Sequence, residues 1–340
     1  MKFIVTADWH IEGYDERYEV ARWILQKAQS DGATVIVAGD ILDKGIRRHA
    51  VLDDLFGGFD VPVYVIRGNH DVCLSSGYVT SSKVCVVDEP EVEVMGGVYF
   101  MFIPYPRSES TPMYGYIKKL FHRVEGKKWI LVSHGDWVRG SNGVYEDAYF
   151  PLTIDDVREF SPAFVFLGHI HKWGYDAEYN VFYPGSPLPI ARDEYGVHYI
   201  IEFDSDEGKI VHVPVSAAPL YLKEEVCVVP GDYRGDVDSW LESVAAKYEG
   251  HKVAGVEVEL FGITDLDRKA LSDYVHMKVS SLWEGADVKI YNGVRLIEDV
   301  PDVVLKFVED IRSMADKRTD VDEQELMEAV WRVVSKGFSR

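Results

Sequence analysis

A short polar segment at residues 68–71, Gly-Asn-His-Asp, constrains the fold of this chain more than any other stretch. It follows an apolar run at residues 61–66 that predicts a buried strand. An amide, an imidazole and a carboxylate therefore stand at the carboxyl end of a strand, where open α/β sheets gather their loops and place their chemistry. We expect an α/β fold with its functional site at that edge.

The residues before this segment predict alternating strands and helices. Apolar runs at 3–7, 34–38 and 61–66 predict strands, and apolar residues at helical spacing predict helices at about 15–30 and 47–57. Such a βαβ series is typical of a parallel sheet that is buried on both faces.

The rest of the first two hundred residues is more β-rich. Residues 84–103 predict an antiparallel addition to the sheet, and residues 183–213 predict a β-meander that closes a domain near residue 215. Between them we expect a helix near 113–124, strands at 129–132 and 163–167, and a polar, loop-rich stretch at 137–162.

Beyond residue 215 the pattern predicts a smaller βαβαβ-like unit to about residue 296, followed by two amphipathic helices at about 301–316 and 321–336. In the first of these helices one apolar face is expected, formed by Val303, Val304, Phe307, Val308, Ile311 and Met314. Either both helices pack on their own protein or they dock into a groove of a partner. Because two short helices bury little core alone, we favour docking.

Charge and cysteine content limit the range of functions. The chain of 340 residues carries 36 basic and 57 acidic side chains, a formal net charge of −21. That balance counts against a nucleic-acid partner unless bound metals or a local basic patch offset it. Three cysteines without metal-ligand spacing, no membrane-spanning run and no signal-peptide layout predict a cytoplasmic protein.

Polar side chains of one kind recur after five predicted strands. The residues suited to hold divalent metals are Asp8, His10, Asp40, Asn69, His134, His169 and His171. One such residue at a strand end is more often a turn former, but five of the eleven histidines fall in these loops. The set predicts two metals bridged by one carboxylate, an arrangement that clamps both oxygens in phosphoryl displacement.

These loops resemble the five motifs of the calcineurin-like metallophosphoesterases. The matching residues are Asp8-x-His10, Gly39-Asp40-x-x-Asp43, Gly68-Asn69-His70-Asp71, Ser133-His134-Gly135 and Gly168-His169-x-His171, in the family's order. The resemblance implies a four-layer α/β/β/α sandwich, which replaces the plain parallel sheet.

The same resemblance implies the roles of the site residues. One metal would lie on Asp8, His10, Asp40 and His171, and the second on Asp40, Asn69, His134 and His169. Manganese is the implied metal, with magnesium as the alternative. His70 would be a general acid that protonates the leaving oxygen, and Asp43 is the best candidate to orient it. Hydrolysis would then proceed by direct attack of hydroxide on phosphorus, without a covalent intermediate.

Within these motifs and shortly after the last of them, the exact residues resemble those of the SbcD nucleases, which are the counterparts of the Mre-eleven double-strand-break repair nuclease. These residues are Asp8-Trp9-His10, the Asp71 of Gly-Asn-His-Asp, and Pro184-Gly185-Ser186-Pro187. This resemblance implies a nuclease domain at 1–215, a DNA-binding capping domain at 216–296 and an ATPase-docking helical tail at 297–340. The implied partners are DNA and an SbcC/Rad-fifty-type ATPase, with a homodimer inside a heterotetramer.

Basic residues beside the metal loops are candidates for DNA contacts. Lys44, Arg47, Arg48 and Arg139 would suit phosphate contacts, although a solvated helix start explains the first three equally well. The leading hypothesis is a DNA nuclease with 3′→5′ exonuclease and single-strand endonuclease activity. A stand-alone phosphatase or cyclic-nucleotide phosphodiesterase is the alternative, which the charge of −21 favours and the additional modules after residue 215 disfavour.

Overall fold

The computed structural model describes residues 1–44, 49–107, 111–139, 148–228 and 233–315, together with Leu326, Ala329, Val330 and Val333. The chain divides into two compact units, Met1–Ala218 and Pro219–Arg340.

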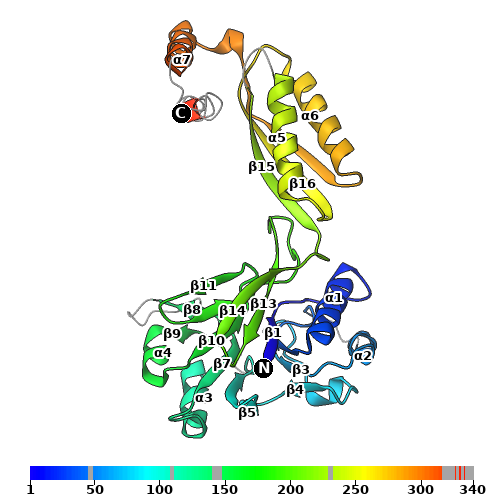
Figure 1. Ribbon diagram of the computed structural model, residues 1–340, viewed down its shortest axis with the longest axis vertical. Coiled ribbons are helices and arrows are strands. Elements are labelled where there is room, and N and C mark those ends of the chain that lie inside the picture. The colour runs from blue at the N-terminus through cyan, green and yellow to red at the C-terminus, as the bar shows by residue number, and fades with distance from the viewer. Residues whose placement is uncertain are drawn as a thin grey trace. The chain divides into compact units, whose positions relative to one another are not determined.

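The first unit is built on two six-stranded sheets (Figure 1). The first sheet has the order β14 (Lys209–Pro214), β13 (Tyr199–Asp204), β1 (Lys2–Thr6), β2 (Thr34–Ala38), β3 (Val63–Ile66), β4 (Val84–Val87). The second has the order β11 (Gly174–Asp176), β12 (Val181–Tyr183), β10 (Phe164–Gly168), β7 (Trp129–His134), β6 (Val98–Ile103), β5 (Glu91–Met95).

The two sheets face each other across an aromatic core. Phe3 of β1 meets Phe100 of β6 with ring centroids 4.9 Å apart, and Phe102, Phe166 and Phe203 belong to the same buried cluster. Along β1, Phe3 and Val5 face this core, whereas Ile4 belongs to the cluster on the other side of the sheet. Because both faces of the strands are buried, the strands are continuously apolar and do not alternate.

Helices cover the outer face of each sheet. Helices α1 (Glu16–Asp31) and α2 (His49–Gly57) pack on the first, and α3 (Met113–Leu120) and α4 (Ile154–Phe160) on the second (Figure 1). The sequence sets the ends of α1, because the Asp15 side chain accepts hydrogen bonds from the Arg17 and Tyr18 amides and Gly32 adopts φ +61°. The predicted α/β/β/α sandwich is confirmed.

Two predictions within this unit are wrong. β4 is not an antiparallel addition, because it pairs parallel to β3; β5 and β6 do form an antiparallel hairpin, but in the second sheet. The expected meander does not exist either. β12 runs parallel to β10 in one sheet, and β13 and β14 form a hairpin in the other. Strand propensity predicts that a segment is a strand and does not specify which sheet it joins.

The stretch expected to be loop-rich contains regular structure. β8 (Trp137–Val138) pairs with β9 (Leu152–Thr153), and α4 follows with a capping box between Thr153 and Asp156. Short 3₁₀ turns lie at Ser76–Tyr78 and Phe121–Arg123.

The second unit is a parallel βαβαβ fold, as predicted. It runs β15 (Leu220–Val228), α5 (Tyr233–Lys247), β16 (Val253–Thr264), α6 (Arg268–Leu282), β17 (Asp287–Asn292), and both strand pairs are parallel. β18 (Arg295–Leu296) pairs with the end of β16 and is followed by a 3₁₀ turn at Ile297–Asp299.

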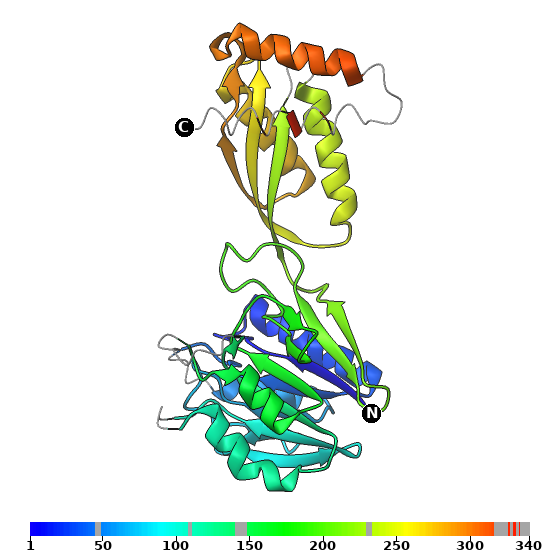
Figure 2. The ribbon, with the colours of Figure 1, turned by 90° about the vertical axis from the view of Figure 1, so that its left-hand side faces the viewer.

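Helix α7 (Asp302–Ala315) packs against the ends of β15 and β16 in the second unit (Figure 2). Val308 is buried together with Cys227 and Ile263, and Val304 and Leu305 pack on the same cluster. The apolar face expected for this helix is partly covered: Val304 and Val308 pack on this cluster, whereas Val303 and Phe307 are 74% and 54% exposed. The Met314 side chain and most of the predicted helix at 321–336 lie outside the described residues. Among the helices of the described residues, none is long and apolar enough to cross a membrane.

Candidate metal centre

Loops from both sheets meet at the carboxyl ends of their strands. Main-chain hydrogen bonds hold the loops after β1 and β2 together: the Asp8 amide donates to the Gly39 carbonyl and the His10 amide to the Asp40 carbonyl, both at 3.0 Å. The second sheet joins them through the His169 amide, which donates to the Asp8 carboxylate at 3.1 Å. All seven predicted ligands converge here.

One half of the site is a pair of histidines and Asp8. His10 Nε2 lies 3.2 Å from His171 Nε2, and donor atoms of Asp8, His10 and His171 all lie within 4.8 Å of one another. The other ring nitrogen of each histidine faces a carboxylate: His171 Nδ1 is 2.7 Å from Glu194, and His10 Nδ1 is 3.3 Å from Asp43.

The other half gathers around Asn69. Its side-chain oxygen Oδ1 lies 2.8 Å from His134 Nε2 and 3.0 Å from His169 Nδ1. Asp40 stands between the halves, because its Oδ2 is 3.4 Å from His134 Nε2 and 3.9 Å from His10 Nε2. The second oxygen of Asp40 is already used, as it accepts the His70 amide at 2.8 Å. This leaves Oδ2 in the bridging position.

The donor chemistry of these atoms fits cations. Because Nδ1 of His10 and Nδ1 of His171 each donate to a carboxylate, their Nε2 lone pairs point at each other across 3.2 Å. The His134 ring is oriented in the same way. Its Nδ1 donates to the Ala38 carbonyl at 2.9 Å, and its Nε2 faces the oxygens of Asn69 and Asp40. Lone pairs opposed in this way are stable only when a proton or a metal ion lies among them. The residues therefore fit two divalent ions.

The pKa shifts of the site residues are also those expected of a functional site. Burial alone would lower the pKa of His134, but the charge of Asp40 raises it to about 9. Burial lowers the pKa of His10 to about 4. For Asp8, burial raises the carboxyl pKa to about 6, and the negative charge of Asp40 adds to the effect. A cluster of groups this far from their ordinary pKa values is typical of a functional site.

The backbone is strained at these residues. Asp8, His10, Asp40 and His169 all have positive φ, at 54°, 47°, 51° and 98°, a region that non-glycine residues seldom occupy. Such conformations cost free energy and persist where function requires them. Gly68 is needed here for space, because a Cβ on it would lie 2.0 Å from Asp40 Oδ1.

His70 lies at the edge of the cluster with Asp43 behind it. Its Nδ1 is 3.0 Å from Asp43 Oδ1, the contact that the predicted orienting role requires. Its ring meets the ring of His10 edge-on with centroids 4.7 Å apart. About a third of the His70 side chain is exposed (35%).

Sequence reasoning missed three residues that support the ligands. Asp71 is buried, and its carboxylate accepts the Ile41 amide at 2.8 Å and the Gly68 amide at 2.6 Å, which ties two metal loops together. Glu194 orients His171, and Asp136 lies 3.7 Å from His169 Nε2. The motif Gly-Asn-His-Asp signalled Asp71, but no local pattern signals Glu194.

Of the four basic residues expected to contact DNA, two lie among the described residues, Lys44 and Arg139. Lys44 is exposed, and Arg47 and Arg48 lie outside the described residues. Arg139 is engaged by acidic neighbours, with Asp176 at 2.9 Å and Glu178 at 2.7 Å. Its charge is therefore largely neutralised.

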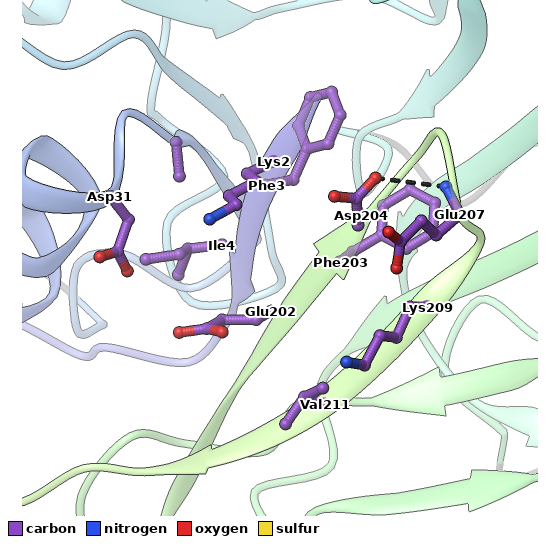
Figure 3. Close-up of a pocket in the computed structure, with 11 residues that line it drawn as sticks. Lys2, Phe3, Ile4, Asp31, Glu202, Phe203, Asp204, Glu207, Lys209 and Val211 are labelled. Carbon is purple, nitrogen blue, oxygen red and sulfur yellow. Dashed lines mark hydrogen bonds between the residues drawn. The ribbon is translucent and has the colours of Figure 1, made fainter.

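A separate pocket of about 280 Å³ lies at the other end of the first sheet (Figure 3). It surrounds the amino end of β1 and the β13–β14 hairpin, whereas the metal centre is at the carboxyl end of β1. Lys27 neutralises two of its acids, Asp31 at 2.9 Å and Glu202 at 2.6 Å. The pocket does not belong to the metal centre.

Comparison with protein families gives one match, to the calcineurin-like phosphoesterase model over residues 1–173. The chain belongs to the calcineurin-like phosphoesterase family. A search of curated proteins found no match.

Solved structures similar to this family member include an archaeal phosphodiesterase, at 13% identity over 63% of this chain and 99% of that chain, with a TM-score of 0.37. Another is YfcE, a phosphoesterase from E. coli, at 13% identity over 63% of this chain and 100% of that chain, with a TM-score of 0.29. Likenesses at this level specify no activity.

Proposed function

We propose that this phosphoesterase is a two-metal phosphodiester hydrolase acting on DNA, the nuclease subunit of a complex with an SMC-like ATPase in double-strand-break repair. The observation that carries the hydrolase part is the paired donor clusters that share Asp40, with His70 and Asp43 at their edge. Two ions held in this way would supply the nucleophile and neutralise charge on the transferring phosphoryl group.

The residues of the chain divide the remaining work. Asp8, Asp40 and Asn69 would provide hard oxygen donors. Four imidazoles would complete the sets, and three of them are fixed by carboxylate or carbonyl partners. The positive-φ backbone of the loops presets these side chains, so that little reorganisation accompanies the reaction.

We propose that His70 donates a proton to the leaving oxygen. With Nδ1–H directed at Asp43, protonated His70 would donate from Nε2. In this proposal Asp43 orients the ring. The same carboxylate also meets His10, so the acid and one metal ligand share a partner.

Support for DNA as the substrate comes from the resemblance of the motif wording to SbcD nucleases and from the second unit. A hydrolase of small phosphate esters has no need of an additional βαβαβ unit with a further helix. We assign that unit to DNA binding and the exposed side of α7, with Val303 and Phe307, to the ATPase. The net charge of −21 favours the alternative, a stand-alone phosphatase or cyclic-nucleotide phosphodiesterase.

Two substrates distinguish these functions. Purified protein with Mn²⁺ should cut linear duplex DNA from its 3′ ends and also hydrolyse bis(p-nitrophenyl) phosphate. Hydrolysis of the small diester without any DNA cleavage, in the presence of the ATPase, would support the alternative. Magnesium in parallel reactions tests the choice of metal.

A further inference from the structure

An aromatic cleft of about 660 Å³ lies beside the metal centre in the first unit. It is formed by the segments at 137–139, 170–178 and 181–183. Four aromatic residues are among those that line it: Trp137, Trp173, Tyr175 and Tyr183. Tyr175 stacks on Phe182 on the face of β11 and β12 that is turned to the first sheet, whereas Trp137 and Tyr183 pack on the outer face of the second sheet. We propose that this cleft binds the bases of a single DNA strand next to the phosphodiester in the metal centre. The inference rests on the proposed function, since it specifies how that site holds its substrate.

The cleft and the centre share two loops. Ile170 and Lys172, which line the cleft, flank the ligand His171 in sequence. On the other side, the Tyr183 hydroxyl donates to the Gly135 carbonyl at 3.0 Å and accepts the Trp137 amide at 2.6 Å, directly after the ligand His134. Bases adjoining a scissile phosphate in the centre therefore lie close to this cleft.

The rings are held in place and remain accessible. Tyr175 is 60% exposed and is stacked on Phe182, with centroids 6.1 Å apart and planes 12° from parallel. Trp173 is 39% exposed and packs edge-on against Tyr199 at 5.4 Å. Rings whose planes are already fixed lose little entropy when a base stacks on them.

The charge of the cleft also suits a nucleic acid strand. Asp176 and Glu178 are both paired with Arg139, so the cleft does not present free carboxylates to a phosphate backbone. Lys172 is exposed and forms no ion pair within the described part of the chain, which leaves it free for a phosphate. In a chain of net charge −21, stacking supplies affinity that does not depend on a basic surface.

The test uses two short labelled oligonucleotides of equal length and charge, oligothymidylate and an abasic analogue with the same phosphates. Binding is measured by fluorescence anisotropy in EDTA, so that cleavage does not interfere. Wild-type protein should bind oligothymidylate more tightly, with quenching of tryptophan emission from the cleft. Tyr175→Ala should weaken that binding roughly 5- to 100-fold and leave binding of the abasic analogue unchanged.

Two controls separate stacking from folding. Tyr175→Phe retains the ring and should bind as wild type does. Val94→Ala removes a 55% exposed side chain from β5, at the opposite edge of the same sheet, and should change neither affinity. Hydrolysis of bis(p-nitrophenyl) phosphate by Val94→Ala should equal that of wild type.

Several outcomes would overturn the proposal: equal binding of both oligonucleotides by wild type, equal loss of both in Tyr175→Ala, or unchanged affinity in that variant. A dimer that Tyr175→Ala dissociates, with oligonucleotide binding intact, would instead identify a second copy of the chain as the occupant. If wild type binds bases in the cleft but cuts no DNA, the nuclease function fails while the cleft assignment stands.

Discussion

At the scale of single residues, one nitrogen in three of the four histidine rings is held by a partner, so that the other nitrogen points inward. His134 donates to the Ala38 carbonyl, His171 to Glu194 and His10 to Asp43. Each contact is made outside the ligand set, and it determines which lone pair a metal meets. The raised pKa of His134, about 9, shows how strongly this arrangement favours positive charge.

His70→Ala tests the assignment of the general acid. We expect turnover to fall roughly 10²- to 10⁴-fold, because that is the usual contribution of positioned proton transfer, while bound Mn²⁺ is unchanged. Metal analysis and steady-state kinetics on the same sample measure both. His122→Ala is the matched control. His122 lies in the 3₁₀ turn after α3, and among the described residues its ring forms a hydrogen bond only with the Lys119 carbonyl. Loss of metal along with activity would make His70 a ligand or a structural residue.

Metal binding should release a proton. Because the pKa of His134 is raised from 6.5 to about 9, its ring is protonated in the metal-free protein at pH 7, and an ion must displace that proton. Mn²⁺ affinity should therefore rise by up to about tenfold per pH unit between pH 7 and pH 9. Calorimetric titrations in buffers of different ionisation heat count the protons. Affinity independent of pH across this range would contradict the charged state of His134.

His134 should also make the stability of the metal-free protein depend on pH, and this stability should fall as pH rises, whereas metal affinity should rise. A folded-state pKa above the unfolded value means that His134 stabilises the protein fully below about pH 6.5, and that this contribution is lost as pH rises through 9.

At the scale of elements, the loops could be predicted where a strand end and its ligands are contiguous in sequence. Residues 8–10, 40–43 and 68–71 are of this kind, and their donor side chains, together with the histidines after two later strands, indicated a metal site. The partition of strands between two sheets could not be predicted from propensity, because β4 and β5 are consecutive strands in the sequence yet join different sheets. The contact between Glu194 and His171 could not be predicted either, because the two residues are 23 positions apart in the sequence.

Asp71 joins two such loops, so its loss should affect both. Asp71→Ala leaves the buried amides of Ile41 and Gly68 without an acceptor, which should lower the free energy of unfolding by roughly 2–4 kcal/mol. Mn²⁺ affinity should fall too, although Asp71 is not a proposed ligand. Chemical denaturation of metal-free protein isolates the stability effect. A variant with unchanged stability and weaker metal binding would show that Asp71 acts on the ligands alone.

Helix α7 offers a matched pair of positions on opposite sides. Val308 is 8% exposed within the second unit's core and Val303 is 74% exposed. Val308→Asp buries a carboxylate among apolar side chains and should destabilise the second unit by roughly 2–4 kcal/mol. Val303→Asp should change stability by less than about 0.5 kcal/mol and should weaken co-purification with the ATPase. Equal destabilisation by both would place Val303 in the core, against the exposure seen.

At the scale of the whole molecule, the metal centre belongs to the first unit, and we assign duplex DNA and partner binding to the second. Each unit has its own buried apolar clusters: the sandwich core of the first unit contains no residue beyond Ala218, and Cys227, Ile263 and Val308 pack within the second. The packing of α7 also changes the expectation for the tail, because removing it would uncover part of the second core.

Truncation at two points tests this division. Residues 1–218 contain every proposed ligand, His70, Asp43 and the supporting Asp71 and Glu194, so the fragment should fold and hydrolyse bis(p-nitrophenyl) phosphate with Mn²⁺ at a rate near that of the full chain. It should lose duplex DNA cleavage and the ATPase, because those are assigned to the second unit. A fragment ending at Asp299 lacks α7 and exposes Cys227, Phe261 and Ile263, so its second unit should melt at a lower temperature than in the full chain while its diesterase activity persists. Insoluble or inactive 1–218 protein would show that the metal centre depends on the second unit, and full duplex cleavage by that fragment would show that the first unit binds DNA unaided.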